Sequence, residues 1–411
     1  MARRRERGAT LVLVVVGLAA LIAMAGLALD TSHVLLNKSR LQSALDAAAL
    51  AAAKVLDQSA STSTATTAAG SVFTLNLAQY PELRNQVNGG LTLLTEYSST
   101  LNPFSPGTAP AKFVRTSITG FATQMSLVTV LGIASVNVAG NAVAGPSPPI
   151  VSACNIVPVF MCGDPTKPPL YGYSVDQVVG LNQVTGTTSA IGPGNYGLLR
   201  LGGNGGNIVR NNLAGSYSSC VGEGPNIPTE PGVAAGPVSD GINTRFNQYK
   251  AGLSSATYPP DPINTTAHQT ALTTDTSGTG CAPSAAPCIK QGSTVVTTAS
   301  QLSFNYSNYT SLLKSQAYDT LPAPNGIAAF GRRVLAVPLG DCTGAANGKN
   351  TVTVSGFACV FLLQQLPNGS NDTIYGQIIG NCDAGGKPGA GGGTSGPHII
   401  ELYKSAGSPD S

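Results

Sequence analysis

The strongest constraint on this chain is an uncharged apolar stretch close to its start. Residues 9–29, ATLVLVVVGLAALIAMAGLAL, contain no Asp, Glu, Lys, Arg or His. As a helix that rises about 1.5 Å per residue, this stretch is long enough to cross a hydrocarbon core of about 30 Å. We therefore expect one membrane-spanning helix, with any globular fold built from the residues that follow it.

The charges on either side of this stretch indicate its orientation. Four arginines lie within residues 1–8, MARRRERG, and Asp30 follows the apolar run. Because basic residues stay on the cytoplasmic side, we expect the N-terminus in the cytoplasm and the bulk of the chain outside. A cleaved secretory signal is the alternative, but its apolar core would span only about 7–15 residues before a small-residue cleavage site. The longer run here favours a retained anchor.

Residues 30–58 are expected to continue as helix, because they contain no proline or glycine. At about 100° per residue, one side carries an apolar stripe, formed by Val34, Leu41, Leu45, Ala48, Ala52, Val55 and Leu56. The opposite side carries Ser39, Ser43, Asp46, Lys54 and Asp57, and Leu50 interrupts it. The stripe predicts packing against this protein's own α/β unit, whereas Leu50 predicts a second contact with another subunit. We expect the Ser/Thr-rich run at 59–71 to end the helix.

Charge and cysteine content exclude some classes of function. A net charge of +3 with 10% charged residues gives no basic field for nucleic acid. All eight cysteines follow the membrane stretch: Cys154, Cys162, Cys220, Cys281, Cys288, Cys342, Cys359 and Cys382. An even number in the exported part predicts disulfides, with buried free thiols as the alternative. The cysteines at 281 and 288, and those at 154 and 162, are each close enough in sequence to close a small loop, and the pairing of the remaining four cysteines stays open. With no CxxC and scattered histidines, no metal site is expected.

The sequence predicts an α+β fold in five parts. They are a basic N-terminus at 1–8, a transmembrane helix at 9–29, an Ala-rich periplasmic helix at 30–58, a small membrane-proximal α/β domain at 59–147, and a β-rich domain at 148–411 rich in Gly, Pro and Asn. The proline-rich GPSPPI at 145–150 indicates the last boundary.

Local patterns predict the elements within the last two parts. In the α/β domain we expect strands at 112–121 and 134–145, joined by a short amphipathic helix at 123–132 that Gly132 closes. In the β-rich domain we expect one helix at 238–253 and a flexible loop at 383–397. The expected strands there are 195–201, 332–339, 351–366, 373–380 and 398–404.

Three short patterns resemble catalytic or metal motifs, and each lacks its context. DTSGT at 275–279 has the spacing of a von Willebrand A-type metal site, but no buried strand precedes it. SLLK at 311–314 has the serine–lysine spacing of penicillin-binding enzymes without their other motifs. GGNGGN at 202–207 lacks the ending of a phosphate loop and is expected to be a turn between strands. We expect no catalytic residue, no cofactor and no small-molecule substrate.

The segment from Arg3 to Leu56 resembles the N-terminal part of the TadE/TadG-like Flp pilus-assembly proteins of the tight-adherence system. The shared pattern is Arg-Gly, an apolar segment, an Asp at its exit, and LQ-x-A-x-D-A-A-A-L-A-A-A. It is formed here by Arg7, Gly8, Asp30, Lys38, Arg40, Leu41, Gln42, Ala44, Asp46, Ala47, Ala48, Ala49, Leu50 and Ala51 to Ala53. From these motif residues and Leu45 we select the residues expected to pack the helix against its neighbours. They are Gly8, Asp30, Leu41, Gln42, Ala44, Leu45, Asp46, Ala48, Ala49, Leu50 and Ala52.

This resemblance implies a single-pass inner-membrane protein of a Gram-negative bacterium, with its bulk in the periplasm. Its partners would be the membrane and other pilus-assembly proteins, and it would act by association in assembling a pilus used for adherence. Many TadG-like proteins carry a von Willebrand A-type insertion, which this sequence lacks.

Two alternatives stay open. The junction RGATLV at 7–12 resembles a prepilin start that is cut after Gly8, which would make the protein a minor pseudopilin. The fifth mature residue would then be Leu13, where processed pilins usually carry Glu, so an uncut anchor is favoured. A membrane-tethered periplasmic enzyme or binding module would rest on residues 151–411.

Overall fold

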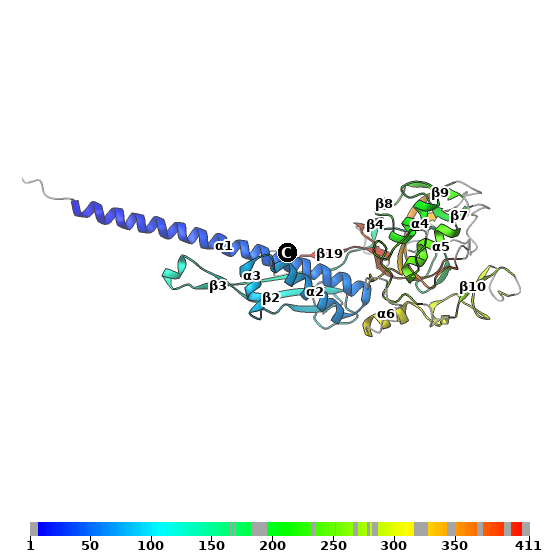
Figure 1. Cartoon of the computed structure of the whole chain (residues 1–411), viewed down its shortest axis with the longest axis horizontal. Helices are drawn as coiled ribbons and strands as arrows, with labels where there is room; N and C mark the ends of the chain where they lie inside the picture. The colour runs from blue at the N-terminus through cyan, green and yellow to red at the C-terminus, as the bar shows by residue number, and fades with distance from the viewer. Residues whose placement is uncertain are drawn as a thin grey trace, which may run out of the picture. The chain divides into compact units, whose positions relative to one another are not determined.

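The computed structural model divides the chain into two compact units. Unit 1 comprises Met1–Ala53, Ala65–Gly145 and Leu402–Ser411, and unit 2 comprises Lys54–Thr64 and Pro146–Glu401. Figure 1 shows the elements of both. The structure describes residues 7–164, 166–167, 170–181, 195–231, 235–250, 252–265, 270–277, 280–281, 287–315, 328–342, 350–367, 373–389 and 396–404.

The first element is a single long helix, α1, which runs from Arg7 to Ser59 without interruption. Among the described residues, it is the one helix long and apolar enough to cross a membrane. Its large apolar side chains between Leu11 and Leu29 are exposed, whereas Leu41, Leu45 and Leu56 are buried. The long N-terminal helix that the sequence predicts is therefore confirmed. The residue that follows it, Ala60, is left-handed with a φ of 52°, which stops the helix.

The first helix ends at Ser59, inside the Ser/Thr-rich run that was predicted to end it. Most of that run then forms a second helix, α2 (Thr62–Leu77), which the sequence did not predict. The buried residues Ala65, Ala69, Phe73 and Leu77 recur every four positions and give α2 an apolar face. The backbone N–H of Thr64 donates to the Ser61 hydroxyl at 3.3 Å, close to the start of α2. Tertiary packing of this face outweighs the weak helix propensity of serine and threonine.

Unit 1 combines these helices with a four-stranded sheet. The sheet order is β1 (Leu94–Ser98), β2 (Phe113–Gln124), β3 (Ser135–Pro146) and β19 (Ile400–Tyr403), and α3 (Pro81–Asn88) precedes β1. The two strands predicted in this unit are present. Edge-to-face contact between the rings of Phe113 and Tyr403, with centroids 5.7 Å apart, adds the C-terminal strand to the unit.

The prediction of an amphipathic helix between β2 and β3 is wrong. Thr123 and Gln124 belong to β2, and only a 3₁₀ turn, η1 (Val128–Leu131), lies in the connection. Gly132 closes this turn with a φ of 83°, as the sequence predicted. Thr123 and Gln124, the first two residues of the predicted helix, pair instead with Val136 and Ser135 of β3. A local sequence pattern does not identify such cross-strand partners.

Unit 2 is built on a seven-stranded sheet. Its main order is β5 (Met161–Cys162), β13 (Val334–Asp341), β14 (Thr351–Leu362), β15 (Tyr375–Ile379) and β6 (Val178–Gly180), and β9 (Asn226–Pro231) pairs with both β14 and β7 (Asn195–Leu199). The β-rich, disulfide-containing part predicted from sequence is thus confirmed. One hydrophobic core includes Val337, Val360 and Ile378 from the sheet and Leu213 and Ile242 from helices.

Helices and 3₁₀ turns accompany this sheet. They are α4 (Gly206–Gly215), α5 (Ala235–Asn243), η2 (Thr244–Phe246), η3 (Ala299–Gln301) and α6 (Tyr306–Ser315). The helix predicted at 238–253 ends early, because Asn247 turns left-handed with a φ of 61°. The strand predicted at 398–404 is split between β18 (Gly396–His398) and β19.

Three small sheets complete unit 2. The first consists of β17 (Gly386–Pro388), β4 (Ile150–Ala153) and β8 (Val221–Gly222). The second consists of β10 (Leu272–Asp275), β11 (Cys288–Gln291) and β12 (Thr294–Val295). The third pairs β16 (Asn381–Asp383) with β18. The flexible loop predicted at 383–397 therefore contains strand β17, which pairs with β4. Residues 390–395 of that prediction lie outside the described residues.

All eight cysteines form disulfides, as the sequence predicted. The pairs are Cys154–Cys220, Cys162–Cys342, Cys281–Cys288 and Cys359–Cys382. The disulfide predicted between Cys281 and Cys288 is confirmed, whereas the prediction of a disulfide between Cys154 and Cys162 is wrong. Antiparallel pairing of Ala153 with Val221 brings Cys154 to Cys220. Parallel pairing of β5 with β13 brings Cys162 to Cys342.

Candidate functional site

The face of α1 that carries the sequence motif is buried inside unit 1. Leu41 and Leu45 are fully buried, and alanines three or four residues apart continue the same face: Ala44, Ala48, Ala49, Ala52 and Ala53. Small side chains let a neighbouring backbone approach the helix closely. Most of the apolar stripe that the sequence predicts is buried, whereas its members Val34 and Val55 are half-buried. The buried face also includes Ala44, Ala49 and Ala53.

Polar groups fix the helix in register against the sheet. The Gln42 amide donates to the Asp46 carboxylate at 2.8 Å and to the backbone carbonyl of Asn141, on β3, at 2.9 Å. The buried Thr116 hydroxyl, on β2, donates to the backbone carbonyl of Leu45 at 3.0 Å. A Cβ atom at Gly140 would lie 2.9 Å from Leu45 Cδ1, so the backbone of β3 approaches that leucine closely. The motif residues therefore form the joint between helix and sheet.

Asp30 forms a second joint, at the end of the apolar segment. Its side chain is buried, and its carboxylate accepts hydrogen bonds from three successive backbone N–H groups. These belong to Ser126, Leu127 and Val128, at 3.1, 2.9 and 2.7 Å. One carboxylate thereby satisfies the amides that open η1. Asp30 holds the turn between β2 and β3 against α1.

Glu82, on α3, is a bridging residue that the sequence analysis missed. Its Oε2 accepts a hydrogen bond from the Asn37 amide at 2.9 Å and lies 2.9 Å from Nε2 of His33. Its Oε1 accepts from the backbone N–H of Gln124 at 3.2 Å. Helix α1, helix α3 and strand β2 thus meet at one carboxylate. Only its position in the first turn of α3 marks Glu82 in the sequence.

The outward side of α1 differs from the sequence-based expectation. Leu50, predicted to make a second contact, is half-buried within this chain. Leu35 and Leu36 are more open, at 60% and 47% exposed, although they lie beyond the 21-residue apolar stretch. Gly8 lies in the first turn of α1. The larger open apolar surface outside that stretch is therefore the Leu35–Leu36 pair.

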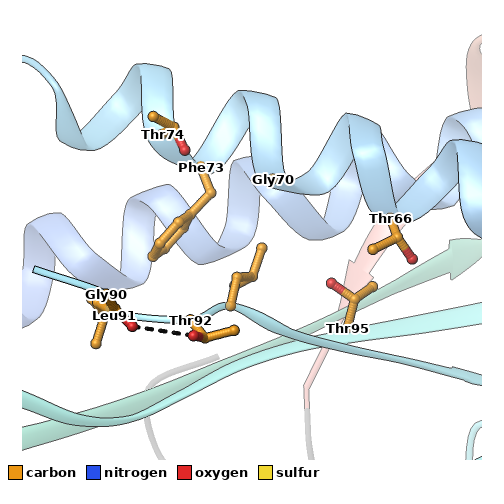
Figure 2. Close-up of a pocket in the computed structure, with 9 residues that line it drawn as sticks. Thr66, Gly70, Phe73, Thr74, Gly90, Leu91, Thr92 and Thr95 are labelled. Atoms are coloured by element: carbon orange, nitrogen blue, oxygen red, sulfur yellow. Dashed lines mark hydrogen bonds between the residues drawn. The ribbon is translucent and has the colours of Figure 1, made fainter. Parts of the chain in front are cut away.

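Unit 1 also contains a surface groove between α2 and the segment that leads into β1. Figure 2 shows its lining, with the Phe73 ring reaching from α2 toward that segment. The groove has a volume of about 300 Å³ and is lined by Thr66, Gly70, Phe73, Thr74, Gly90, Leu91, Thr92, Leu93 and Thr95. None of these side chains titrates near neutral pH, so the groove offers no general acid or base.

The motif-like patterns in unit 2 have their polar atoms engaged locally. The Ser311 hydroxyl, on α6, donates to the carbonyl of Ser307 at 2.8 Å. Asp275 accepts from the hydroxyl of Ser277 at 2.6 Å and pairs with Lys290 at 3.3 Å. Thr279 lies outside the described residues. Within the described ranges, no group of three His, Cys, Asp or Glu side chains could hold a metal ion.

The glycine-rich GGNGGN segment leads from a strand into α4, rather than between two strands as predicted. The N-terminus of this helix is already occupied by a carboxylate, because the N–H of Gly205 donates to Glu230 Oε1 at 3.1 Å. Arg200 pairs with the same carboxylate at 2.6 Å. The anion that such a helix end favours is therefore Glu230 itself.

A buried charged cluster stabilises the interior of unit 2. The Arg333 guanidinium donates to the carbonyls of Ile263, Leu362 and Leu363, and it lies 4.6 Å from the centre of the Phe361 ring. Burial lowers the pKa of Arg333 to about 10, which leaves it charged at neutral pH. Asp261 accepts from the Tyr309 hydroxyl at 2.9 Å and from the Arg333 backbone N–H at 3.2 Å.

The same burial raises the pKa of Asp261, opposed by the positive charge of Arg333. Burial also raises the pKa of Tyr309 well above its usual value. The Asp261 carboxylate also accepts from the backbone N–H of Ile263 at 2.9 Å, so the cluster connects several segments of unit 2 through hydrogen bonds.

Comparison with known proteins assigns the N-terminal segment. Residues 8–55 match the family described as Flp pilus-assembly TadE/G-like. This confirms the resemblance predicted for this segment, and it places the family match on α1 with its buried joint. Searches of curated proteins and of solved structures found no match.

Proposed function

We propose that this protein is a single-pass inner-membrane component that acts by association in the assembly of a tight-adherence pilus. Residues 9–29 would cross the membrane with the N-terminus in the cytoplasm, and the chain from Asp30 onward would lie in the periplasm. The observation that carries the proposal is the TadE/G-like match over residues 8–55, on a helix whose large apolar side chains from Leu11 to Leu29 are exposed.

Two further features support this arrangement. Apolar side chains that are exposed all around a helix suit a lipid environment and would be unfavourable in water. The four disulfides suit the oxidising side of the membrane, where the positive-inside charge pattern would put them.

The surface for a partner subunit would be the open side of α1, at Leu35 and Leu36. The buried side of the helix is already occupied by this protein's own sheet, so a partner would meet the opposite one. Leu50 would contribute at its edge, because part of its side chain stays accessible.

A deletion strain tests the pilus role. Loss of the gene should abolish or strongly reduce surface pili and adherence, and the full-length chain should restore both. Normal pili in the deletion strain would refute the proposal. Mass spectrometry of the mature N-terminus then separates an anchor that keeps Met1 or Ala2 from a pseudopilin that starts at Ala9.

Charge substitutions test the surface. Leu36→Asp and Leu50→Asp should fold normally but weaken crosslinking to partner proteins in the membrane, with Leu36 having the larger effect because it is more exposed. Leu75→Asp is the matched control, since Leu75 is an exposed leucine on α2. If all three variants crosslink like the parent protein, these leucines are not the association surface.

A further inference from the structure

The turn between β2 and β3 ends in an apolar surface. Leu127, Ile133 and Val136 are 49%, 46% and 36% exposed, although their side chains are large and apolar. The surrounding sequence is also neutral, because residues 116–163 contain no Asp, Glu, Lys, Arg or His. We call residues 125–136 the hairpin tip. Its composition suits an environment less polar than water.

The hairpin tip is fixed beside the end of the membrane segment. The three hydrogen bonds from its backbone to Asp30 attach it one residue beyond the apolar stretch. A Cβ atom at Gly26 would lie 3.1 Å from the Cβ of Leu127, so the helix backbone and this leucine are in direct contact. Figure 1 shows the β2–β3 hairpin lying alongside α1.

These contacts determine where the hairpin tip would lie if α1 spans a membrane. Gly26 is three residues before Leu29, which corresponds to about 5 Å along a helix. The tip is therefore level with the end of the apolar stretch, where hydrocarbon gives way to lipid headgroups. Its exposed side chains continue the exposed apolar surface of α1 itself, so the surface that meets lipid on the helix extends onto the tip.

We propose that the hairpin tip inserts into the outer interface of the membrane and gives unit 1 a second attachment beside α1. The partner is the lipid bilayer. Two attachments restrict rotation and tilt of unit 1, which a single helix would leave free. Asp30 acts as a positioning residue, because it holds the tip at the depth where the apolar side chains reach lipid. This inference rests on the membrane anchor in the proposed function.

Depth-dependent quenching in vesicles of phosphatidylethanolamine and phosphatidylglycerol tests the inference on the full-length chain. Single cysteines for a fluorescent label replace Ile133 at the tip, Ala139 further along β3, and Leu18 in the membrane segment. Ala139 is exposed and lies six residues from Ile133, or roughly 20 Å along a strand. The described native cysteines are all in disulfides and do not compete for the label.

We expect quenchers deep in the acyl chains to act on Leu18→Cys, and shallow quenchers to act on Ile133→Cys at least about threefold more strongly than on Ala139→Cys. Equal weak quenching at Ile133→Cys and Ala139→Cys, with Leu18→Cys still quenched, would overturn the inference and leave the anchor intact. No quenching at Leu18→Cys would instead overturn the anchor in the proposed function.

A charge substitution provides an independent measurement. With the label at Val136→Cys, adding Ile133→Asp should reduce shallow quenching at least about twofold, because a carboxylate disfavours the interface. Leu75→Asp should leave it unchanged. Quenching that Ile133→Asp does not alter would overturn insertion of the tip. Vesicles that hold this chain alone contain no other protein, so a tip protected only in cells would identify a protein partner and would also contradict the inference.

Discussion

The joint of α1 in unit 1 and the interior of unit 2 are stabilised by opposite kinds of residue. In unit 1, alanine, leucine and glycine pack a helix on a sheet, and the few polar groups bind backbone atoms, as Thr116 and Gln42 do. In unit 2, disulfides and the fully buried Arg333 and Asp261 connect distant parts of the chain.

The difference follows from how each region is built along the chain. The joint in unit 1 rests on one continuous helix, whose periodic small residues create a surface without long-range covalent links. Unit 2 has short strands separated by long connections, so it has few local interactions to oppose the entropy of the unfolded chain. Covalent links and a charged cluster that fix several segments at once compensate for this. Mutations should therefore affect the two regions by different mechanisms.

The largest expected effect concerns the disulfides of unit 2. The Cys162–Cys342 bond spans 180 residues, whereas Cys281–Cys288 spans 7. Loop-closure entropy gives losses of roughly 5 and roughly 2 kcal/mol, respectively, when each pair is replaced by serine. Denaturant unfolding of the full chain in detergent, followed by hydrogen exchange in unit 2, measures both. Equal losses would contradict the role of loop length.

The next effect concerns Arg333. Arg333→Leu removes the donors to three carbonyls and leaves Asp261 buried without its positive neighbour, which should cost about 3–5 kcal/mol. Lys314→Leu is the control, since Lys314 is an exposed cation on α6. Hydrogen exchange should show loosening in unit 2 for the first variant only. If the two variants unfold at the same denaturant concentration, the buried cluster contributes nothing to stability.

A smaller effect is expected in unit 1. Leu45→Ala leaves a cavity between α1 and the sheet and should cost about 2–4 kcal/mol. Leu75→Ala, at an exposed leucine, should cost little. Faster amide exchange in β2 and β3, with unit 2 unchanged, would place the loss at this joint. Faster exchange in unit 2 alone would show that the joint does not depend on Leu45.

The smallest effect is a pH dependence at His398 in unit 2. Burial by itself lowers the pKa of His398, but the hydrogen bond and charge of Asp57 and the charge of Asp383 raise it above its usual 6.5. Because the folded pKa is raised, the stabilisation is complete below about pH 6.5 and is lost as pH rises through the folded pKa.

His398→Gln should therefore be less stable than the parent protein at pH 6 and should approach it as the pH is raised. The expected difference is roughly 1 kcal/mol, because the Asp57 carboxylate is partly exposed to solvent. Thermal unfolding at a series of pH values measures it, with Asp57→Asn as the paired variant. If the stability difference between His398→Gln and the parent protein grew with pH, folding would lower the pKa of His398 rather than raise it.

Several features were predictable because they depend on neighbouring residues. The long helix follows from an apolar run without proline or glycine, and β13 and β14 follow from short β-branched runs. Short separation predicted the disulfide between Cys281 and Cys288 correctly but failed for Cys154, whose partner Cys220 is set by strand pairing. The roles of the motif residues in contacting other subunits stay predictions. Leu35 and Leu36 were overlooked because exposure depends on which side of the helix the sheet covers.

The sequence by itself determined that this chain has a long helix able to span a membrane, a TadE/G-like segment, and a following part with paired cysteines. These properties lie in composition and in local periodicity. Only the tertiary structure decided that the Ser/Thr run is helical, that Cys154 pairs with Cys220, and that Asp30 binds the amides of the hairpin tip. Each of these depends on residues distant in the chain, whose approach is set by packing and strand pairing rather than by any local pattern.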